Sequence, residues 1–173
     1  MAKNKIVIAN HKMNMLSSDI NIYLKKIKEQ INIENVIICP SCIYIPYFLK
    51  QNFKVGIQNI FYKSKGAYTG EISPRQAKSM EVDYAIVGHS ERRKYFLETN
   101  NEINQKIELC LKNNLKVILC IGENKEEKYE GKTKEVLESE LVENLANISN
   151  LEDVIIAYEP IWAIGTNETP TTN

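Results

Sequence analysis

Short apolar runs alternate with longer amphipathic segments along most of the chain. The runs are rich in β-branched residues and apolar throughout, which is typical of parallel strands that are covered on both faces. Six strands are predicted in this way, at residues 5–9, 36–39, 54–58, 84–88, 117–121 and 154–158.

The segments between these runs have helical spacing of apolar residues or begin with capping residues. A first helix is predicted to start at the N-cap candidates Ser17, Ser18 and Asp19. Its apolar face comprises Ile20, Leu24, Ile27 and Ile31. Further helices are predicted at about 45–52, from Ser73-Pro74 onward, from about residue 90, at 99–113 and at 133–147.

This alternation is compatible with two α/β architectures, an open doubly wound sheet or a closed barrel. The first strand is not followed by the Gly-x-Gly-x-x-Gly of a dinucleotide-binding sheet. Polar residues follow several strands instead, namely Asn10 and Lys12, His89 and Glu91, and Glu159. The carboxyl ends of all strands in a barrel meet at one mouth, so these side chains would converge there. The pattern therefore favours the α/β barrel.

Composition adds few constraints. The 173 residues suit one domain or part of a larger one, with 43% hydrophobic and 25% charged residues. The formal net charge of +0 gives no indication of a nucleic-acid or anionic-membrane partner. No apolar run approaches the roughly 20 residues of a spanning helix. The first strand begins at once, without a signal-peptide pattern, so a cytoplasmic location is expected.

The chain has 4 cysteines, and Cys39 and Cys42 have the spacing of a redox motif. A thioredoxin-type motif would place its first cysteine at a helix N-terminus, whereas Cys39 ends a predicted strand. A zinc site would require a second close pair, and Cys110 and Cys120 are too far apart in sequence for that. Reduced, structural thiols are therefore predicted.

The run 157–166, AYEPIWAIGT, is the most informative for chemistry. Pro160 biases Glu159 toward an extended conformation, so the carboxylate leaves the sixth strand at a defined angle. The apolar neighbours would partly desolvate this carboxylate and make it a stronger base. Gly165-Thr166 would let the loop move and bring a backbone N–H close to an anion. An isolated Glu-Pro pair would more simply be a surface carboxylate at a strand end.

Four stretches together resemble the triosephosphate isomerase family, in that family's order and spacing. They are 9–14 (ANHKMN), 66–71 (GAYTGE), 86–93 (IVGHSERR) and 157–166 (AYEPIWAIGT). The resemblance covers the whole chain. It implies an eight-stranded TIM barrel that interconverts dihydroxyacetone phosphate and glyceraldehyde 3-phosphate in glycolysis and gluconeogenesis, with no cofactor and no metal.

The resemblance also implies roles for individual residues. Glu159 is the expected base, and His89, kept neutral at a helix start, would exchange protons with the substrate oxygens. Lys12 would bind the substrate phosphate and stabilise the charge of an enediolate. Asn10 would position Lys12 and a substrate oxygen, and Glu91 would pair with Lys12.

A lid and a homodimer are implied in the same way. The loop from residue 160 to about 169 would close over the substrate, exclude water and bring the Gly165 N–H to the phosphate. Thr69 would be inserted beside the site of a second subunit. Arg92 and Arg93 are expected to form structural ion pairs.

Three features depart from the family pattern. His11 stands where an aromatic residue is common, and no chemistry is expected from it; Asn167 stands where the lid often ends with glycine. A TIM barrel typically has about 250 residues, so strands seven and eight with their phosphate-binding loops are not expected within these 173 residues. We therefore expect a single barrel domain, 1–173, that is truncated after strand six, with open edges at strands one and six and negligible activity of its own.

Two other interpretations stay open at this point. Another phosphate-binding barrel enzyme would share the architecture but would not require Lys12, His89 and Glu159 together. Alternatively, the chain is an inactive fragment that serves as a folding or interaction module. An assay with glyceraldehyde 3-phosphate separates these interpretations.

Overall fold

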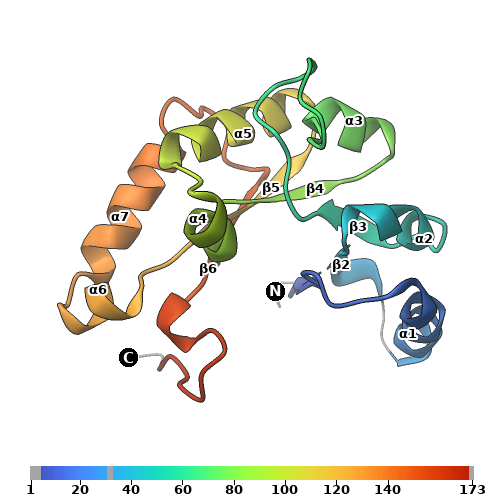
Figure 1. Ribbon diagram of the computed structural model, residues 1–173, viewed down its shortest axis with the longest axis horizontal. Helices are drawn as coiled ribbons and strands as arrows, with labels where there is room; N and C mark the ends of the chain where they lie inside the picture. The colour runs from blue at the N-terminus through green and yellow to red at the C-terminus, as the bar shows by residue number, and fades with distance from the viewer. Residues whose placement is uncertain (1–4, 31–32, 172–173) are drawn as a thin grey trace.

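A computed structural model describes residues 5–30 and 33–171 of the chain. Six parallel strands form one curled sheet in the order β1-β2-β3-β4-β5-β6 (Figure 1). Their bounds are β1 Val7–Asn10, β2 Val36–Cys39, β3 Lys54–Ile57, β4 Tyr84–Val87, β5 Lys116–Ile121 and β6 Val154–Tyr158. A doubly wound sheet reverses its strand order at a switch point, and this sheet does not. The barrel-type α/β fold predicted from the sequence is therefore confirmed, with strand bounds that differ by one or two residues.

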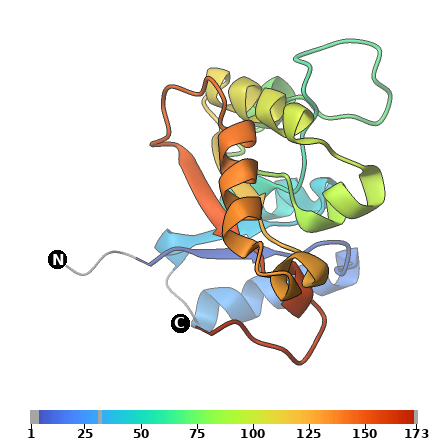
Figure 2. The same ribbon diagram turned by 90° about the vertical axis from the view of Figure 1, so that its left-hand side faces the viewer.

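Helices connect successive strands and cover the outer face of the sheet (Figures 1 and 2). The α-helices are α1 Ser17–Gln30, α2 Ile45–Leu49, α3 Pro74–Ser79, α4 Ser90–Phe96, α5 Asn100–Lys112, α6 Lys125–Tyr129 and α7 Thr133–Asn144. The 3-10 helices are η1 Ile33–Asn35, η2 Cys42–Tyr44 and η3 Ile161–Ala163. Ile31, predicted on the apolar face of the first helix, lies outside the described residues.

Side-chain caps explain where several helices begin. Ser73 and Thr99 each form a capping box with the residue three positions on, as the predicted helix starts require. Asn124 and Glu127 form a third box at α6, a helix that the sequence analysis did not anticipate. Such caps stabilise a helix by about 1 kcal/mol each.

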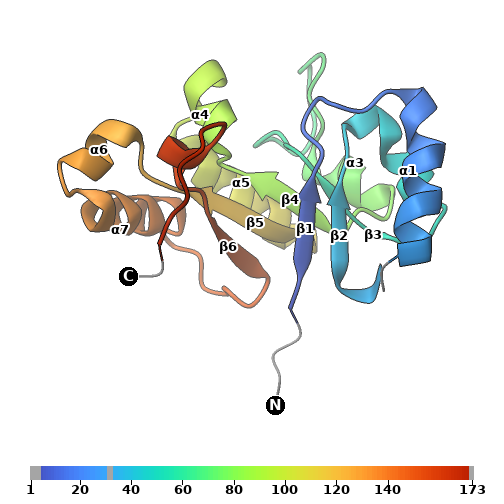
Figure 3. The same cartoon turned by 90° about the horizontal axis from the view of Figure 1, so that it is seen from below.

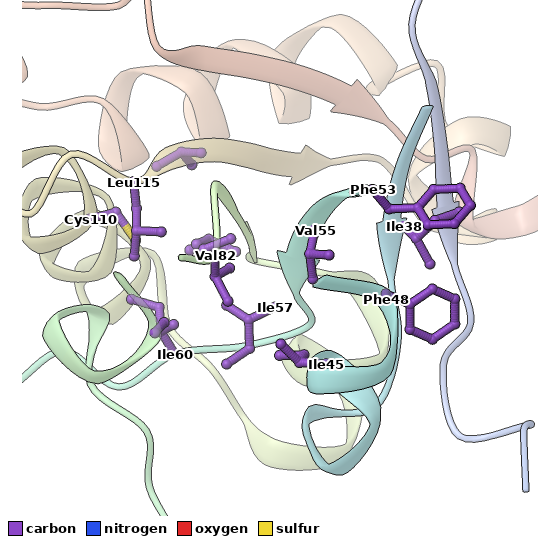
Figure 4. Packing of buried hydrophobic residues seen from close by; sticks show 14 of the residues in the cluster. Ile38, Ile45, Phe48, Phe53, Val55, Ile57, Ile60, Val82, Cys110 and Leu115 are labelled. Atoms are coloured by element: carbon purple, nitrogen blue, oxygen red, sulfur yellow. The ribbon is translucent and has the colours of Figure 1, made fainter. Parts of the chain in front are cut away.

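Apolar residues fill both sides of the sheet. Alternate residues of the middle strands, such as Ile38, Val55 and Val117, pack against the helices in the larger core cluster (Figure 4). The intervening residues, including Ile37, Ile86 and Ile118, face the inside of the curl as a second cluster. Because both faces are apolar, these strands show no polar alternation in the sequence.

The two end strands are less buried than the middle ones. β1 pairs with β2 and β6 pairs with β5, and each is the outermost strand of its side of the described sheet (Figure 3). Val7 is 57% exposed and Tyr158 is 45% exposed, whereas β2 and β4 are buried along their whole length. No helix among the described residues is long and apolar enough to span a bilayer.

Candidate active site

Lys12 is held in a fixed and unusual backbone conformation just beyond β1. Its φ of 50° lies in the left-handed region, which costs a residue with a side chain about 1–2 kcal/mol. Hydrogen bonds offset this cost. The Lys12 carbonyl accepts from Ser41 Oγ at 3.1 Å and from Gln58 Nε2 at 2.9 Å, and its N–H donates to Asn10 Oδ1 at 3.0 Å. The loop is thus shaped by contacts from the ends of β2 and β3.

The Lys12 side chain points to the start of α4. Its ammonium lies 2.9 Å from Glu91 Oε1, and both side chains are partly exposed. Such a half-exposed ion pair stabilises the fold by about 0–1 kcal/mol. An anion that enters the site can therefore replace Glu91 as the partner of Lys12 at low cost.

His89 is positioned by the turn between β4 and α4. Gly88 has a φ of 72°, which only glycine adopts without strain, and His89 is the N-cap of α4. Its Nδ1 accepts the Glu91 backbone N–H at 3.2 Å, so the proton of the neutral ring is on Nε2. Nε2 lies 2.9 Å from Glu159 Oε1. The ring is therefore a neutral donor directed into the mouth of the sheet.

Glu159 ends β6 in contact with both neighbouring strand ends. Its backbone carbonyl would lie 1.8 Å from a Cβ on Gly122, so glycine is required at the end of β5. Its carboxylate accepts from His89 Nε2 and, at 3.1 Å, from the Ser90 backbone N–H. Burial acts to raise the pKa of Glu159, but the His89 and Ser90 hydrogen bonds outweigh it and the pKa is lowered.

This result corrects the expectation that desolvation makes Glu159 a stronger base. The apolar environment is present, since only 17% of the Glu159 side chain is exposed. The two hydrogen-bond donors stabilise the charged form more than burial destabilises it. In this arrangement the carboxylate is ionised and ready to accept a proton, but it is a weaker base than predicted.

The predicted lid is attached to the fold through Trp162. The indole is buried and its Nε1 donates to Glu123 Oε1 at 2.9 Å; the Tyr158 hydroxyl donates to the same oxygen at 3.0 Å. Lys128 Nζ lies over the indole ring. Beyond this anchor the loop is exposed, and Gly165 has a φ of 72°. No heavy atom of the described residues lies within 4 Å of the point that a Cβ on Gly165 would occupy. The start of the lid is thus fixed, and its tip is open at Gly165.

The fold brings most of the predicted residues to one cleft of about 400 Å³. Its lining includes Asn10, Lys12, His89 and Glu91. Glu159 reaches these residues through His89. Two predicted residues stand apart, because Gly165 and Thr69 are exposed on separate loops. A neighbouring cleft of about 500 Å³ lies between Ser90 and the lid residues Ile161 and Ile164.

Several contributors to the site were not singled out from the sequence. Ser41 and Gln58 hold the Lys12 carbonyl, Ser90 binds the Glu159 carboxylate, and Gly122 allows its close approach. Each of the four follows the end of a predicted strand. That shared position was the available signal, since polar residues there face the same mouth.

The cysteines and arginines do not form a second chemical centre. All four cysteines are free thiols, as predicted, and three are buried. No group of three or more potential metal ligands occurs within residues 5–30 and 33–171. Arg92 pairs with Glu98 at 3.5 Å and Arg93 with Glu140 at 3.4 Å, consistent with structural roles.

Comparison with known proteins places these residues in a family context. A model of the triosephosphate isomerase family matches residues 5–173. The chain is 42% identical to the triosephosphate isomerase of Thermodesulfovibrio yellowstonii, over 96% of this chain and 71% of the relative. It is 40% identical to that of Dictyoglomus turgidum, over 95% and 70%, and 39% identical to that of Clostridium botulinum (strain Loch Maree), over 98% and 71%.

Proposed function

The chain belongs to the triosephosphate isomerase family, and from this premise we propose that it carries the isomerase chemistry of dihydroxyacetone phosphate and glyceraldehyde 3-phosphate. The observation that supports this most directly is the 2.9 Å contact between His89 Nε2 and Glu159, with the Lys12 ammonium on the same mouth. An acid, a base and a cation are the groups that proton transfer next to a carbonyl requires. The reaction belongs to glycolysis and gluconeogenesis.

Binding begins at Lys12 in this proposal. The substrate phosphate takes the place of Glu91 beside the Lys12 ammonium, and Asn10 orients a substrate oxygen. Charge that develops on the substrate oxygens is stabilised by the same ammonium. The fixed backbone of Lys12 supports this role, because a cation held in place requires no reorganisation during the reaction.

Glu159 and His89 then transfer the protons. Substrate oxygens compete for the His89 Nε2–H that Glu159 accepts in the structure, which frees the carboxylate to turn to the carbon atom. Glu159 removes the proton from one carbon to give an enediolate, while His89 donates its Nε2 proton to one oxygen and recovers a proton from the other. Glu159 returns its proton to the neighbouring carbon, so both residues end as they began.

The lid and a second subunit complete the proposed enzyme. Closure of the loop that begins at Pro160 would bring the Gly165 N–H to the phosphate and exclude water. Met13, 94% exposed, lines the cleft and gives it an apolar border that a partner's loop carrying Thr69 would cover. We therefore infer a cytoplasmic homodimer in which residues 1–173 belong to one barrel domain.

An isomerisation assay tests the proposal. The protein at its natural length should convert glyceraldehyde 3-phosphate to dihydroxyacetone phosphate with saturation, and should turn over unphosphorylated glyceraldehyde far more slowly. Absence of turnover, or equal turnover of the two aldehydes, would refute it. The contrast between the aldehydes reports on the phosphate contact and therefore on the role assigned to Lys12.

A further inference from the structure

His11 connects the Lys12 loop to the helical layer through its side chain. Its ring packs edge-on against Tyr23 of α1, with centroids 4.9 Å apart, and against Phe48 of α2 at 5.6 Å. Nε2 is 3.2 Å from the Tyr23 hydroxyl. The other ring nitrogen, Nδ1, is buried and has no hydrogen-bond partner among the described residues.

The backbone of His11 transmits this position to Lys12. The His11 N–H donates to the Cys39 carbonyl at 3.0 Å, and the His11 carbonyl accepts from Asn14 Nδ2 at 3.3 Å. The next residue is Lys12 in its left-handed conformation. Anchoring of the ring against α1 and α2 therefore helps to hold a backbone conformation that Lys12 would not otherwise favour.

We propose that His11 is a positioning residue for Lys12 and that its protonation weakens phosphate binding. This inference rests on the proposed function, because it assigns to Lys12 the substrate phosphate. Protonation places a second N–H at Nδ1, where no acceptor lies among the described residues, and puts a charge among aromatic rings. The ring then has to leave its site, and the Lys12 loop loses the anchor that keeps its ammonium in place.

The groups that face His11 favour its neutral form. Tyr23 is neutral, and burial raises the pKa of its hydroxyl. From α2 the contact is the hydrocarbon ring of Phe48; from β2 it is the Cys39 carbonyl, and burial raises the pKa of the Cys39 thiol to about 12. The neighbouring Lys12 ammonium is paired with Glu91. Burial accordingly lowers the pKa of His11 from its usual 6.5.

The sign of the pH dependence follows from this direction. Above pH 6.5 His11 is neutral in folded and unfolded chains, and the anchor is intact. As the pH falls below 6.5 toward the lowered folded pKa, the unfolded chain binds the proton first, so folded-state stability decreases through that window. At and below the folded pKa the folded chain is protonated too, and phosphate affinity falls by at most about tenfold per pH unit for this single proton.

The test is calorimetric binding of glycerol 3-phosphate, which has no carbonyl and is not isomerised, by the protein at its natural length. Wild type and His11→Phe are compared at about pH 7.5 and about pH 5.5, on either side of the usual histidine pKa. His11→Phe keeps the ring packing but takes no proton, while the ligand and the other site residues titrate alike in both proteins. The wild-type Kd should rise between these pH values by at least about threefold more than the variant Kd. Equal pH profiles would overturn the inference.

A second measurement decides the matter even if His11→Phe does not fold. The His11 ring pKa is followed by NMR in the wild-type protein, with the resonance assigned through its contact with Tyr23. Since protonation and binding oppose each other, saturating glycerol 3-phosphate should lower the His11 pKa further. A pKa that ligand leaves unchanged would overturn the inference and spare the proposed function. Absence of any glycerol 3-phosphate binding would instead overturn the proposed function and this inference with it.

Discussion

The middle of the sheet and its two end strands position their catalytic candidates by different means. His89 follows β4, whose residues are all buried between the two core clusters. Lys12 and Glu159 follow β1 and β6, which are partly exposed. These two residues are held mainly by hydrogen bonds that come from other strand ends. Packing thus fixes one member of the site, and polar contacts across the mouth fix the other two.

This difference separates stability from chemistry. Changes at the end strands that spare the backbone should reduce catalysis with little loss of stability, because few buried contacts are removed. Changes in the middle strands should reduce the free energy of unfolding by cavity formation. The predictions below test this separation in the protein at its natural length.

The largest effect is expected at Lys12. Lys12→Met removes the cation of the cleft while keeping much of the side-chain volume, so binding of glycerol 3-phosphate and turnover should both be lost. Calorimetry and the isomerase assay measure the two effects. Lys112→Met is the matched control, because its partner Glu108 lies 2.7 Å away on the exposed face of α5. Wild-type affinity in Lys12→Met would contradict the assignment.

The next effect concerns the strands themselves. Ile118 on β5 is 2% exposed and Ile156 on the adjacent β6 is 44% exposed. Ile118→Ala should lower the free energy of unfolding by about 2–5 kcal/mol, and Ile156→Ala by about 1 kcal/mol or less. Urea denaturation gives both values. Equal losses would show that β6 is as well packed as β5 in the natural protein.

A smaller effect is expected from shortening the base. Glu159→Asp withdraws the carboxylate by one methylene from the substrate carbon, and a displacement of about 1 Å can cost on the order of a hundredfold in rate. The kcat should fall by about this factor, while KM changes little. Glu152→Asp, at an exposed position before β6, provides the control. An unchanged kcat would remove Glu159 from its role.

Much of the fold was predictable because its signals are local. Apolar runs located all six strands, and the polar residues after them identified Asn10, Lys12, His89, Glu91 and Glu159 as one group. The helix α6 was missed because it has five residues and is too short to show helical periodicity. Its Asn124-Glu127 capping box was its only local signal.

The electrostatics of the site were less predictable because they depend on distant residues. The pKa of Glu159 is lowered by donors on His89 and Ser90, about 70 positions earlier in the chain. Lys12 is held by Ser41 and Gln58, which are 29 and 46 positions away. No window of sequence contains both members of these pairs, so the direction of the Glu159 shift required the fold. The same holds for His11, whose partners are on α1 and α2.

The central claim is that Glu159, at the end of the less buried β6, carries the proton in this site. It is tested most directly by isomerisation of glyceraldehyde 3-phosphate in deuterated water, with wild type compared to Glu159→Gln. The wild-type product should contain deuterium on the carbon that receives the proton, because the Glu159 carboxyl exchanges with solvent. In Glu159→Gln, both isomerisation and deuterium incorporation should be lost, although glycerol 3-phosphate still binds. Wild-type rates of isomerisation and labelling in Glu159→Gln would contradict the account.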